Sequence, residues 1–313
     1  MAKRRLGRSN LEITPLMFGG NVFGWTADQA TSELILDAFV DLGGDAIDTA
    51  DVYSAFAPPN QGGESETVIG HWLKKSGKRA RVIIATKVGM WAKRPGLKRA
   101  NIEKAVEDSL KRLQTDYIDL YQSHRDDPDA DIEETLEAFD ALVRKGKVRA
   151  IGASNFEPAR LSRALSVSAE KGLARYETLQ PLYNLMERGF EQSLQKLCVD
   201  EGVSVIPYFG LASGFLTGKY RTAADKAKSV RGARVEGYLN DRGLRVLAAL
   251  DAVAARQGAL PAQVALAWLM AKPAIAAPIA SATSVPQLQE LMGAVRLKLS
   301  AEDLAALDAA SAS

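Results

Sequence analysis

Four side chains that can donate, accept or stabilise a proton follow three short apolar segments of the chain. Asp48 and Tyr53 lie in "AIDTADVY" (residues 46–53), Lys87 ends "VIIATK" and His124 ends "YIDLYQSH". Each residue alone has an ordinary structural explanation, such as a salt bridge, a cap or packing. Together they suit the reduction of a carbonyl group, which needs a hydride donor at its carbon and a proton donor at its oxygen.

Each of the four residues has a separate part in that chemistry. A phenol has a pKa of about 10, so Tyr53 keeps its proton at neutral pH but releases it reluctantly. The ammonium of Lys87 is expected to favour the phenolate and so to make Tyr53 a stronger acid. Asp48 would hold the partly desolvated Lys87 in its charged form. His124 would donate a hydrogen bond to the substrate carbonyl and stabilise negative charge developing on its oxygen.

Short apolar runs alternate with longer segments of helical period along the chain. The runs predict eight strands, at residues 16–18, 46–48, 82–87, 118–122, 148–152, 178–180, 204–207 and 276–279. The segments between them predict helices at residues 31–42, 65–75, 98–113, 132–145, 158–171, 190–201, 241–257, 261–272 and 285–293. Eight strand and helix pairs favour an α/β fold closed as a (β/α)8 TIM barrel over an open, doubly wound sheet.

Such a barrel places its site at the C-terminal ends of the strands, which is where the four residues stand. Residues 7–10 predict an N-terminal hairpin, and Ser300 with Asp303 in "LSAEDLAAL" predicts the start of a C-terminal helix. The irregular segment 210–240 is interpreted as a long loop on the functional face. No repeat or linker divides the chain, so residues 1–313 are expected to form a single domain.

The composition limits the partners that the chain can have. The balance of 40 Lys and Arg against 38 Asp and Glu favours neither nucleic acid nor an anionic membrane as a partner. No apolar run is as long as a membrane span and no signal-type segment opens the chain, so the expected location is the cytoplasm. The single cysteine, Cys198, stands at the spacing of a packed helix face. We expect a small carbonyl or alcohol substrate and no metal, and the oligomeric state is left open.

Six segments together resemble the aldo-keto reductase family. They are "DTADVY", "ATKVG", "DYIDLYQSH", "IGASNF", "QPLYN" and "FGLASGFLTGKY", and they follow one another in the order found in that family. The sequence resembles the branch that includes channel-associated β subunits. The resemblance implies a (β/α)8 barrel, a nicotinamide cofactor bound without a Rossmann domain, and a catalytic tetrad of Asp48, Tyr53, Lys87 and His124.

The resemblance also assigns residues to the cofactor. Ser154, Asn155 and Gln180 would bind the nicotinamide carboxamide, since their side chains offer both donors and acceptors, and the ring of Tyr208 would stack on the nicotinamide. The loop along the pyrophosphate would contribute Phe209, Gly210, Leu211, Gly214, Leu216, Gly218 and Lys219. A nucleoside triphosphatase P-loop is excluded because Ser213 stands where its first glycine should be and Tyr220 follows Lys219.

The end of the cofactor that carries the adenosine is less clearly marked. The segment "PIASATSVPQLQEL" would contribute Ser281, Thr283 and Gln287, but it lacks the basic residue that often meets a 2′-phosphate in this family. Hydroxyl and backbone groups at the start of the following helix can bind a phosphate, and Arg231 or Arg234 of the long loop would assist. The resemblance therefore favours NADP(H), with NAD(H) possible.

Substrate recognition is predicted from aromatic residues that follow strand ends. Trp25, Phe56 and Trp91 would form an aromatic wall around the carbonyl, and Arg125 would meet an acidic or polar tail. Two other functions stay open at this point. Lys87 at a strand end could form a Schiff base, as in class I aldolases, and the channel-associated branch suggests a cofactor-sensing binding module.

Overall fold

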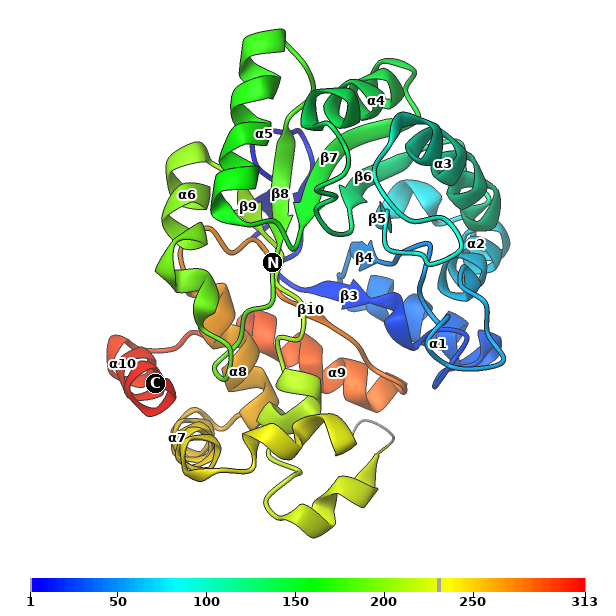
Figure 1. Cartoon of the computed structure of the whole chain (residues 1–313). Helices are drawn as coiled ribbons and strands as arrows, with labels where there is room; N and C mark the ends of the chain where they lie inside the picture. The colour runs from blue at the N-terminus through cyan, green and yellow to red at the C-terminus, as the bar shows by residue number, and fades with distance from the viewer. Residues whose placement is uncertain (1, 230–231, 313) are drawn as a thin grey trace.

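The structure, a computed structural model, describes residues 2–229 and 232–312. Its centre is a ring of parallel strands surrounded by helices (Figure 1). In the order of the sheet from β3 onward, the strands are β3 (Met17–Gly19), β4 (Ala46–Asp48), β5 (Ile83–Val88), β6 (Ile118–Ser123), β7 (Val148–Ser154), β8 (Tyr176–Gln180) and β9 (Ser204–Val205), and β10 (Ile279–Ala280) pairs with β3. The fold is the predicted (β/α)8 barrel.

Backbone hydrogen bonds close the ring between its first and last members. The Val205 amide donates to the Ala274 carbonyl at 2.8 Å, and the Ala276 amide donates to the Val205 carbonyl at 2.8 Å. The Ile279 amide then donates to the Pro207 carbonyl at 2.9 Å. The predicted strand at residues 276–279 is therefore displaced: regular pairing with β3 begins at Ile279, while the residues before it extend the contact with β9.

Helices cover the outer face of the ring. They are α1 (Gln29–Asp41), α2 (Glu64–Ser76), α3 (Arg99–Leu113), α4 (Ile132–Arg144), α5 (Pro158–Lys171), α6 (Leu194–Glu201), α7 (Asp241–Gln257), α8 (Pro261–Met270), α9 (Val285–Gly293) and α10 (Ala301–Ser311). Gly172 ends α5 in the left-handed region at φ +66°, which favours glycine. Ser300 caps α10 and Asp303 completes the capping box, as the sequence predicts.

Short 3-10 helices occupy several connections. They are η1 (Gly20–Val22), η2 (Arg79–Arg81), η3 (Gly189–Gln192), η4 (Ala212–Thr217), η5 (Ala223–Lys228), η6 (Gly232–Tyr238) and η7 (Ala294–Arg296). Two predictions are corrected here. The helix expected at residues 190–201 is split into η3 and α6, because Ser193 leaves helical geometry at φ −146° and ψ −43°. The segment expected to be an irregular loop contains η4, η5 and η6.

The interior of the barrel is apolar at its N-terminal end and polar at its C-terminal end. Ala46, Ala85, Leu120 and Ala150 pack in one buried cluster inside the ring. Because side chains alternate with a period of two along a strand, the inward position after each of them is two residues further on. These next positions are Asp48, Lys87, Gln122 and Gly152. The inward-facing side chains of these strands therefore form an apolar layer and, two residues further along each strand, a layer that contains the polar residues.

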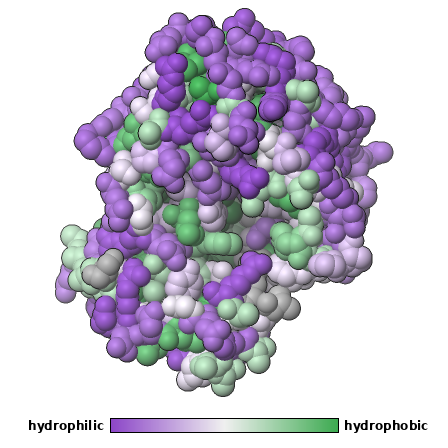
Figure 2. All heavy atoms as spheres, viewed as in Figure 1, coloured by the Kyte–Doolittle hydropathy of each residue, from purple (hydrophilic) through white to green (hydrophobic). Residues whose placement is uncertain are grey.

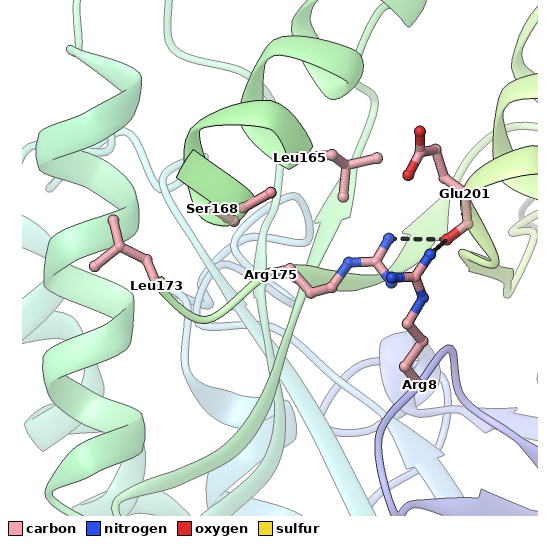
Figure 3. A pocket seen from close by; sticks show the side chains of 7 residues that line it. Arg8, Leu165, Ser168, Leu173, Arg175 and Glu201 are labelled. Atoms are coloured by element: carbon pink, nitrogen blue, oxygen red, sulfur yellow. Dashed lines mark hydrogen bonds between the residues drawn. The ribbon is translucent and has the colours of Figure 1, made fainter. Parts of the chain in front are cut away.

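The predicted hairpin closes the apolar end of the barrel. Strands β1 (Arg4–Arg5) and β2 (Glu12–Ile13) pair antiparallel, and Leu6, Leu11 and Ile13 pack onto the interior cluster. A pocket beside the hairpin lies at the N-terminal ends of β8 and β9, on the opposite side from the polar layer. Its Arg8 and Arg175 both donate to the Glu201 carbonyl at 3.0 Å, so they cap the C-terminus of α6 (Figure 3).

No helix within residues 2–229 and 232–312 combines the length and the apolar character needed to traverse a bilayer.

Gly70 sets how closely α2 approaches α3. A Cβ atom at this position would overlap the Arg112 carbonyl oxygen and lie 2.8 Å from the carbonyl carbon of Leu113. We expect Gly70→Ala to lower the free energy of unfolding by about 1–3 kcal/mol despite the higher helix propensity of alanine, because backbone cannot yield as a side chain does. Urea unfolding measures this change. Gly189→Ala, where a Cβ meets nothing within 4 Å, is the control and should leave the unfolding midpoint in place.

Candidate active site

Three of the four predicted catalytic side chains form one hydrogen-bonded cluster at the polar end of the barrel. Lys87 Nζ donates to Asp48 Oδ2 at 2.7 Å, to the Thr49 carbonyl at 2.8 Å and to the Tyr53 hydroxyl at 3.0 Å. The Tyr53 hydroxyl also lies 3.3 Å from Asp48 Oδ2. Lys87 and Asp48 are 0% and 1% exposed, so the ion pair is buried. All three N–H groups of the ammonium therefore have acceptors.

His124 lies beside this cluster. Its ring meets the ring of Tyr53 edge-on, with centroids 5.9 Å apart, and its Nδ1 is buried without a hydrogen-bond partner among the described residues. Burial, together with the charges of Lys87 and Arg125, holds the pKa of His124 well below its ordinary value. The imidazole is therefore neutral at pH 7 and carries a single N–H.

The electrostatics of Tyr53 differ from the sequence-based expectation. Burial first, and then the carboxylate of Asp48, raise the pKa of the Tyr53 hydroxyl well above its ordinary value. Burial also lowers the pKa of Lys87, although Asp48 opposes that change. The expectation that Lys87 makes Tyr53 a stronger acid than an ordinary phenol does not hold in this structure, because burial and then the nearby carboxylate disfavour the phenolate. Tyr53 is held in the protonated form that a proton donor needs.

A network of amide and hydroxyl groups adjoins the cluster. Gln180 Nε2 donates to Asp48 Oδ1 at 2.9 Å, and Ser154 Oγ donates to the Gln180 carbonyl at 2.8 Å. Asn155 donates to the carbonyl of His124 at 3.1 Å and accepts from the Tyr208 hydroxyl at 2.9 Å. Asn155 adopts φ +55°, in the left-handed region that asparagine tolerates. The four residues predicted to bind a nicotinamide thus form one hydrogen-bonded network with Asp48 and the backbone of His124.

The sequence analysis assigned no role to Gln122, which is fully buried within this network. Its Nε2 lies 3.4 Å from Asp48 Oδ1, and its Oε1 accepts from Gln180 Nε2 at 3.3 Å. A signal for it was present in the sequence. Gln122 is two residues before His124 and two after an interior leucine, so the strand period places it inside the barrel.

The predicted pyrophosphate loop has an unusual backbone. Phe209, Ala212 and Ser213 have positive φ values of 55°, 47° and 57°, which non-glycine residues rarely adopt, and Gly214 and Gly218 are also left-handed. Such backbone persists only where the surroundings impose it, and it is frequent at ligand sites. Lys219 is exposed on this loop, whereas the side chain of Leu216 is buried and packs in the core. Gly210 and Leu211 lie at its start.

Two of the residues predicted for the adenosine end, Thr283 and Gln287, meet at the start of α9. Gln287 Oε1 accepts from the amide and the hydroxyl of Thr283 at 2.9 and 3.1 Å. Ser281 donates to Asn21 Oδ1 at 2.6 Å. Arg234 is exposed, and Arg231 lies outside the described residues.

The predicted substrate residues lie on loops that follow the strands. Trp25 and Phe56 meet edge-on with ring centroids 5.1 Å apart. Trp91 donates to the Gln61 carbonyl at 3.0 Å, and Arg125 is exposed. The face of the molecule seen in Figure 2 is hollowed near its middle, where the ring of strands in Figure 1 has its centre.

Two further observations concern other chemistries. Within residues 2–229 and 232–312, no group of three or more His, Cys, Asp or Glu side chains is arranged to hold a metal ion. Cys198 is buried, and burial raises the pKa of its thiol to about 12, as expected of a packed thiol.

The sequence matches the Aldo/keto reductase family over residues 15–312. This chain belongs to the aldo-keto reductase family. It is 35% identical to "Protein tas" of Escherichia coli (strain K12), over 99% of this chain and 97% of that protein. It is 36% identical to "Aldo-keto reductase YhdN" of Bacillus subtilis (strain 168), over 94% and 87% of the two chains. A "Probable voltage-gated potassium channel subunit beta" of Arabidopsis thaliana is 32% identical, over 94% and 91%.

Membership of this family supports an oxidoreductase activity and NAD(P)H-dependent reduction of carbonyl groups. The residues of the structure fit such a cofactor. The side-chain amide of Gln180 donates to Asp48 and Gln122, Ser154 Oγ donates to the backbone carbonyl of Gln180, and Asn155 Nδ2 donates to Ser154 Oγ. A carboxamide needs both acceptors and donors of this kind.

Asp51, from the same "DTADVY" segment, lies beside the predicted tetrad, and its amide donates to the Lys87 carbonyl at 3.3 Å. It is 1% exposed, and its Oδ1 has no hydrogen-bond partner among the described residues. Burial, followed by the charge of Glu66, raises the pKa of Asp51 to about 7, while Arg112 and Arg94 oppose this. Glu66 itself is held by Thr86 and Arg112, each at 2.6 Å.

The raised pKa of Asp51 predicts a particular dependence of stability on pH. A folded-state pKa above the unfolded value gives stability that is complete at acidic pH and is lost as the pH rises toward 7. Asp51→Asn carries no titrating group. Its free energy of unfolding relative to the parent should therefore increase by roughly 2–3 kcal/mol between pH 5 and pH 8. Urea unfolding at both values tests this, with the exposed Asp200→Asn as the control. If the free energies of unfolding of Asp51→Asn and the parent differ by the same amount at pH 5 and at pH 8, Asp51 is ionised in the folded protein over this whole range.

Proposed function

We propose that this protein reduces an aldehyde or ketone to an alcohol, or oxidises the alcohol in reverse, with Tyr53 as the proton donor. When bound, a reduced nicotinamide supplies the hydride directly to the carbonyl carbon. The observation that carries this proposal is the position of Lys87 Nζ, which bridges Asp48 at 2.7 Å and the Tyr53 hydroxyl at 3.0 Å. One phenolic proton is thereby held beside a buried cation and its counterion.

The side chains divide the work on the substrate oxygen. Tyr53 passes its proton to the oxygen as hydride arrives at the carbon, and the ammonium of Lys87 stabilises the phenolate that remains. Asp48 keeps Lys87 charged in spite of its burial. His124, which is neutral, donates its single N–H to the substrate oxygen and so orients the carbonyl.

We assign the cofactor to the network around Gln180. Ser154, Asn155 and Gln180 would bind the carboxamide, and Tyr208 would stack on the ring. The pyrophosphate would lie along Phe209, Gly210, Leu211, Gly214, Leu216, Gly218 and Lys219, and the adenosine end near Ser281, Thr283 and Gln287. The family habit favours NADP(H), although NAD(H) is possible because the hydroxyl residues Thr283 and Ser284, rather than a cation, precede α9.

The substrate would enter between the loops that follow the strands. Trp25 and Phe56, whose rings touch, would contact an apolar part of the substrate, with Trp91 and Arg125 at the margin. We further propose that residues 1–313 act as a single domain in the cytoplasm.

The contacts of Lys87 also bear on the aldolase alternative. A Schiff base requires a free amine, whereas the three hydrogen bonds of Nζ occupy every N–H of an ammonium. This geometry supports the role of Lys87 as an ion-pair partner. Borohydride trapping of a carbonyl substrate on Lys87 would contradict that role.

The direct test is titration of the purified protein with NADPH and with NADH, in which binding is measured by the quenching of tryptophan fluorescence. We expect saturable binding of at least one nucleotide and, with that nucleotide, turnover within a panel of aldehydes and ketones. Binding without turnover across the panel would favour a cofactor-sensing module. Indifference to both nucleotides would contradict the proposal.

Tyr53→Phe should keep the affinity for the cofactor and lose most turnover, because only the hydroxyl is removed. We expect kcat to fall by roughly 10²–10⁴-fold. Steady-state reduction and fluorescence titration measure the two effects. Tyr121→Phe is the matched control, since its buried hydroxyl has no hydrogen-bond partner among the described residues. Unchanged reduction in Tyr53→Phe would exclude Tyr53 as the proton donor.

Lys87→Met should resemble Tyr53→Phe in turnover, because the phenolate loses the ammonium that lies 3.0 Å from its oxygen. The loss of that charge also raises the pKa of Tyr53 further, so the rate profile against pH should change shape. Stopped-flow or steady-state rates from pH 5 to pH 10 measure this. Lys272→Met, which breaks an ion pair with Asp308 far from the site, is the control. Coincident profiles for parent and Lys87→Met would contradict the assignment.

A further inference from the structure

Gln122 connects the predicted catalytic cluster with the predicted cofactor site. It lies in register with Lys87 on one neighbouring strand and with Gly152 on the other, at the centre of the polar layer. Its amide contacts both Asp48 and Gln180, at 3.4 and 3.3 Å. No other described side chain contacts both of these residues through hydrogen bonds.

The carboxylate of Asp48 determines how the two amides are oriented. A carboxylate only accepts hydrogen bonds, so Gln122 and Gln180 must both present their NH₂ groups to Asp48 Oδ1. Gln180 Nε2 then uses its second N–H on Gln122 Oε1. The side-chain oxygen of Gln180, Oε1, consequently points away from Asp48 and is left as an acceptor.

We propose that Gln122 is a positioning residue. It holds the side-chain Oε1 of Gln180 toward the carboxamide of the nicotinamide, and its hydrogen bond to Asp48 disperses part of the negative charge of that carboxylate. The inference rests on the proposed function, because it needs a nicotinamide bound at Gln180. Through its two contacts, Gln122 links recognition of the carboxamide to the acidity of the tetrad.

The effect on acidity has a definite sign. Asp48 is one cause of the raised pKa of Tyr53, since its negative charge disfavours the phenolate. Hydrogen bonds donated to Asp48 Oδ1 spread that charge and weaken the effect. Loss of Gln122 should therefore raise the pKa of Tyr53 further.

The barrel makes room for Gln122 at Gly152. A Cβ on Gly152 would overlap Thr178 Oγ1 and lie 3.1 Å from Gln122 Cγ, closer than nine in ten real Cβ contacts. The absence of a side chain at residue 152 therefore gives the long amide its place in the middle of the barrel. Thr178 offers a control at the same depth, because its hydroxyl is buried without a hydrogen-bond partner among the described residues.

The experiment compares Gln122→Met with Thr178→Val. Methionine matches glutamine in length but cannot donate to Asp48 or accept from Gln180. The probes are NADPH and its analogue in which a methyl ketone replaces the carboxamide, and the readout is the Kd of each from tryptophan fluorescence. We expect the parent and Thr178→Val to favour the carboxamide, and Gln122→Met to lose about fivefold of that preference. The alkaline limb of the rate profile should move to higher pH in Gln122→Met alone.

The outcomes separate this inference from the proposed function. A parent that binds neither nucleotide would overturn both. A parent that prefers the carboxamide, beside a Gln122→Met variant with the same preference and the same pH profile, would overturn the inference alone. If Gln122→Met does not fold, Gln122→Glu keeps the shape. The protonated glutamic acid can make the same two hydrogen bonds as the amide, but the ionised form cannot. The preference of Gln122→Glu for the carboxamide should therefore be lost as the pH rises. A preference that does not change with pH would refute the role of Gln122.

Discussion

The ion pair between Lys87 and Asp48 is the interaction on which the rest of the site depends. Both side chains are almost completely buried, and their charged atoms lie 2.7 Å apart. A buried pair is tolerated only when its remaining donors and acceptors are also satisfied. Thr49 and Tyr53 accept the other two hydrogen bonds of the Lys87 ammonium, and the side-chain amides of Gln122 and Gln180 donate to the Asp48 carboxylate. The other polar residues of the layer are thus required by the pair itself.

The barrel supplies the surroundings in which this pair can exist. The interior beneath it is apolar and is closed from below by Leu6 and Leu11 of the hairpin, so the polar layer opens only toward the loops that follow the strands. The low polarity of that interior strengthens the hydrogen bonds within the layer and makes an unpaired group costly. It also keeps Tyr53 protonated and His124 neutral, since burial is the first cause of both pKa shifts.

Much of this organisation was predictable from local patterns. The number of strands, the hairpin and the capping of α10 by Ser300 agree with the sequence analysis, because strand period and helix caps are local properties. Asp48, Tyr53 and Lys87 were also expected to meet, because parallel strands bring their C-terminal ends together. The hydrogen bond of Trp91 to the Gln61 carbonyl was not predictable in this way, because no local pattern encodes a contact between two separate loops.

The sequence by itself determined the alternation of strands and helices, the family, and which side chains stand at the ends of the strands. These follow from spacing along the chain, where each residue constrains its near neighbours. Only the tertiary structure decided the net charge environment of Tyr53 and the hydrogen bonds of Gln122 with Asp48 and Gln180. Those properties depend on distances between strands far apart in the chain and on exclusion of water, and both arise only when the barrel closes.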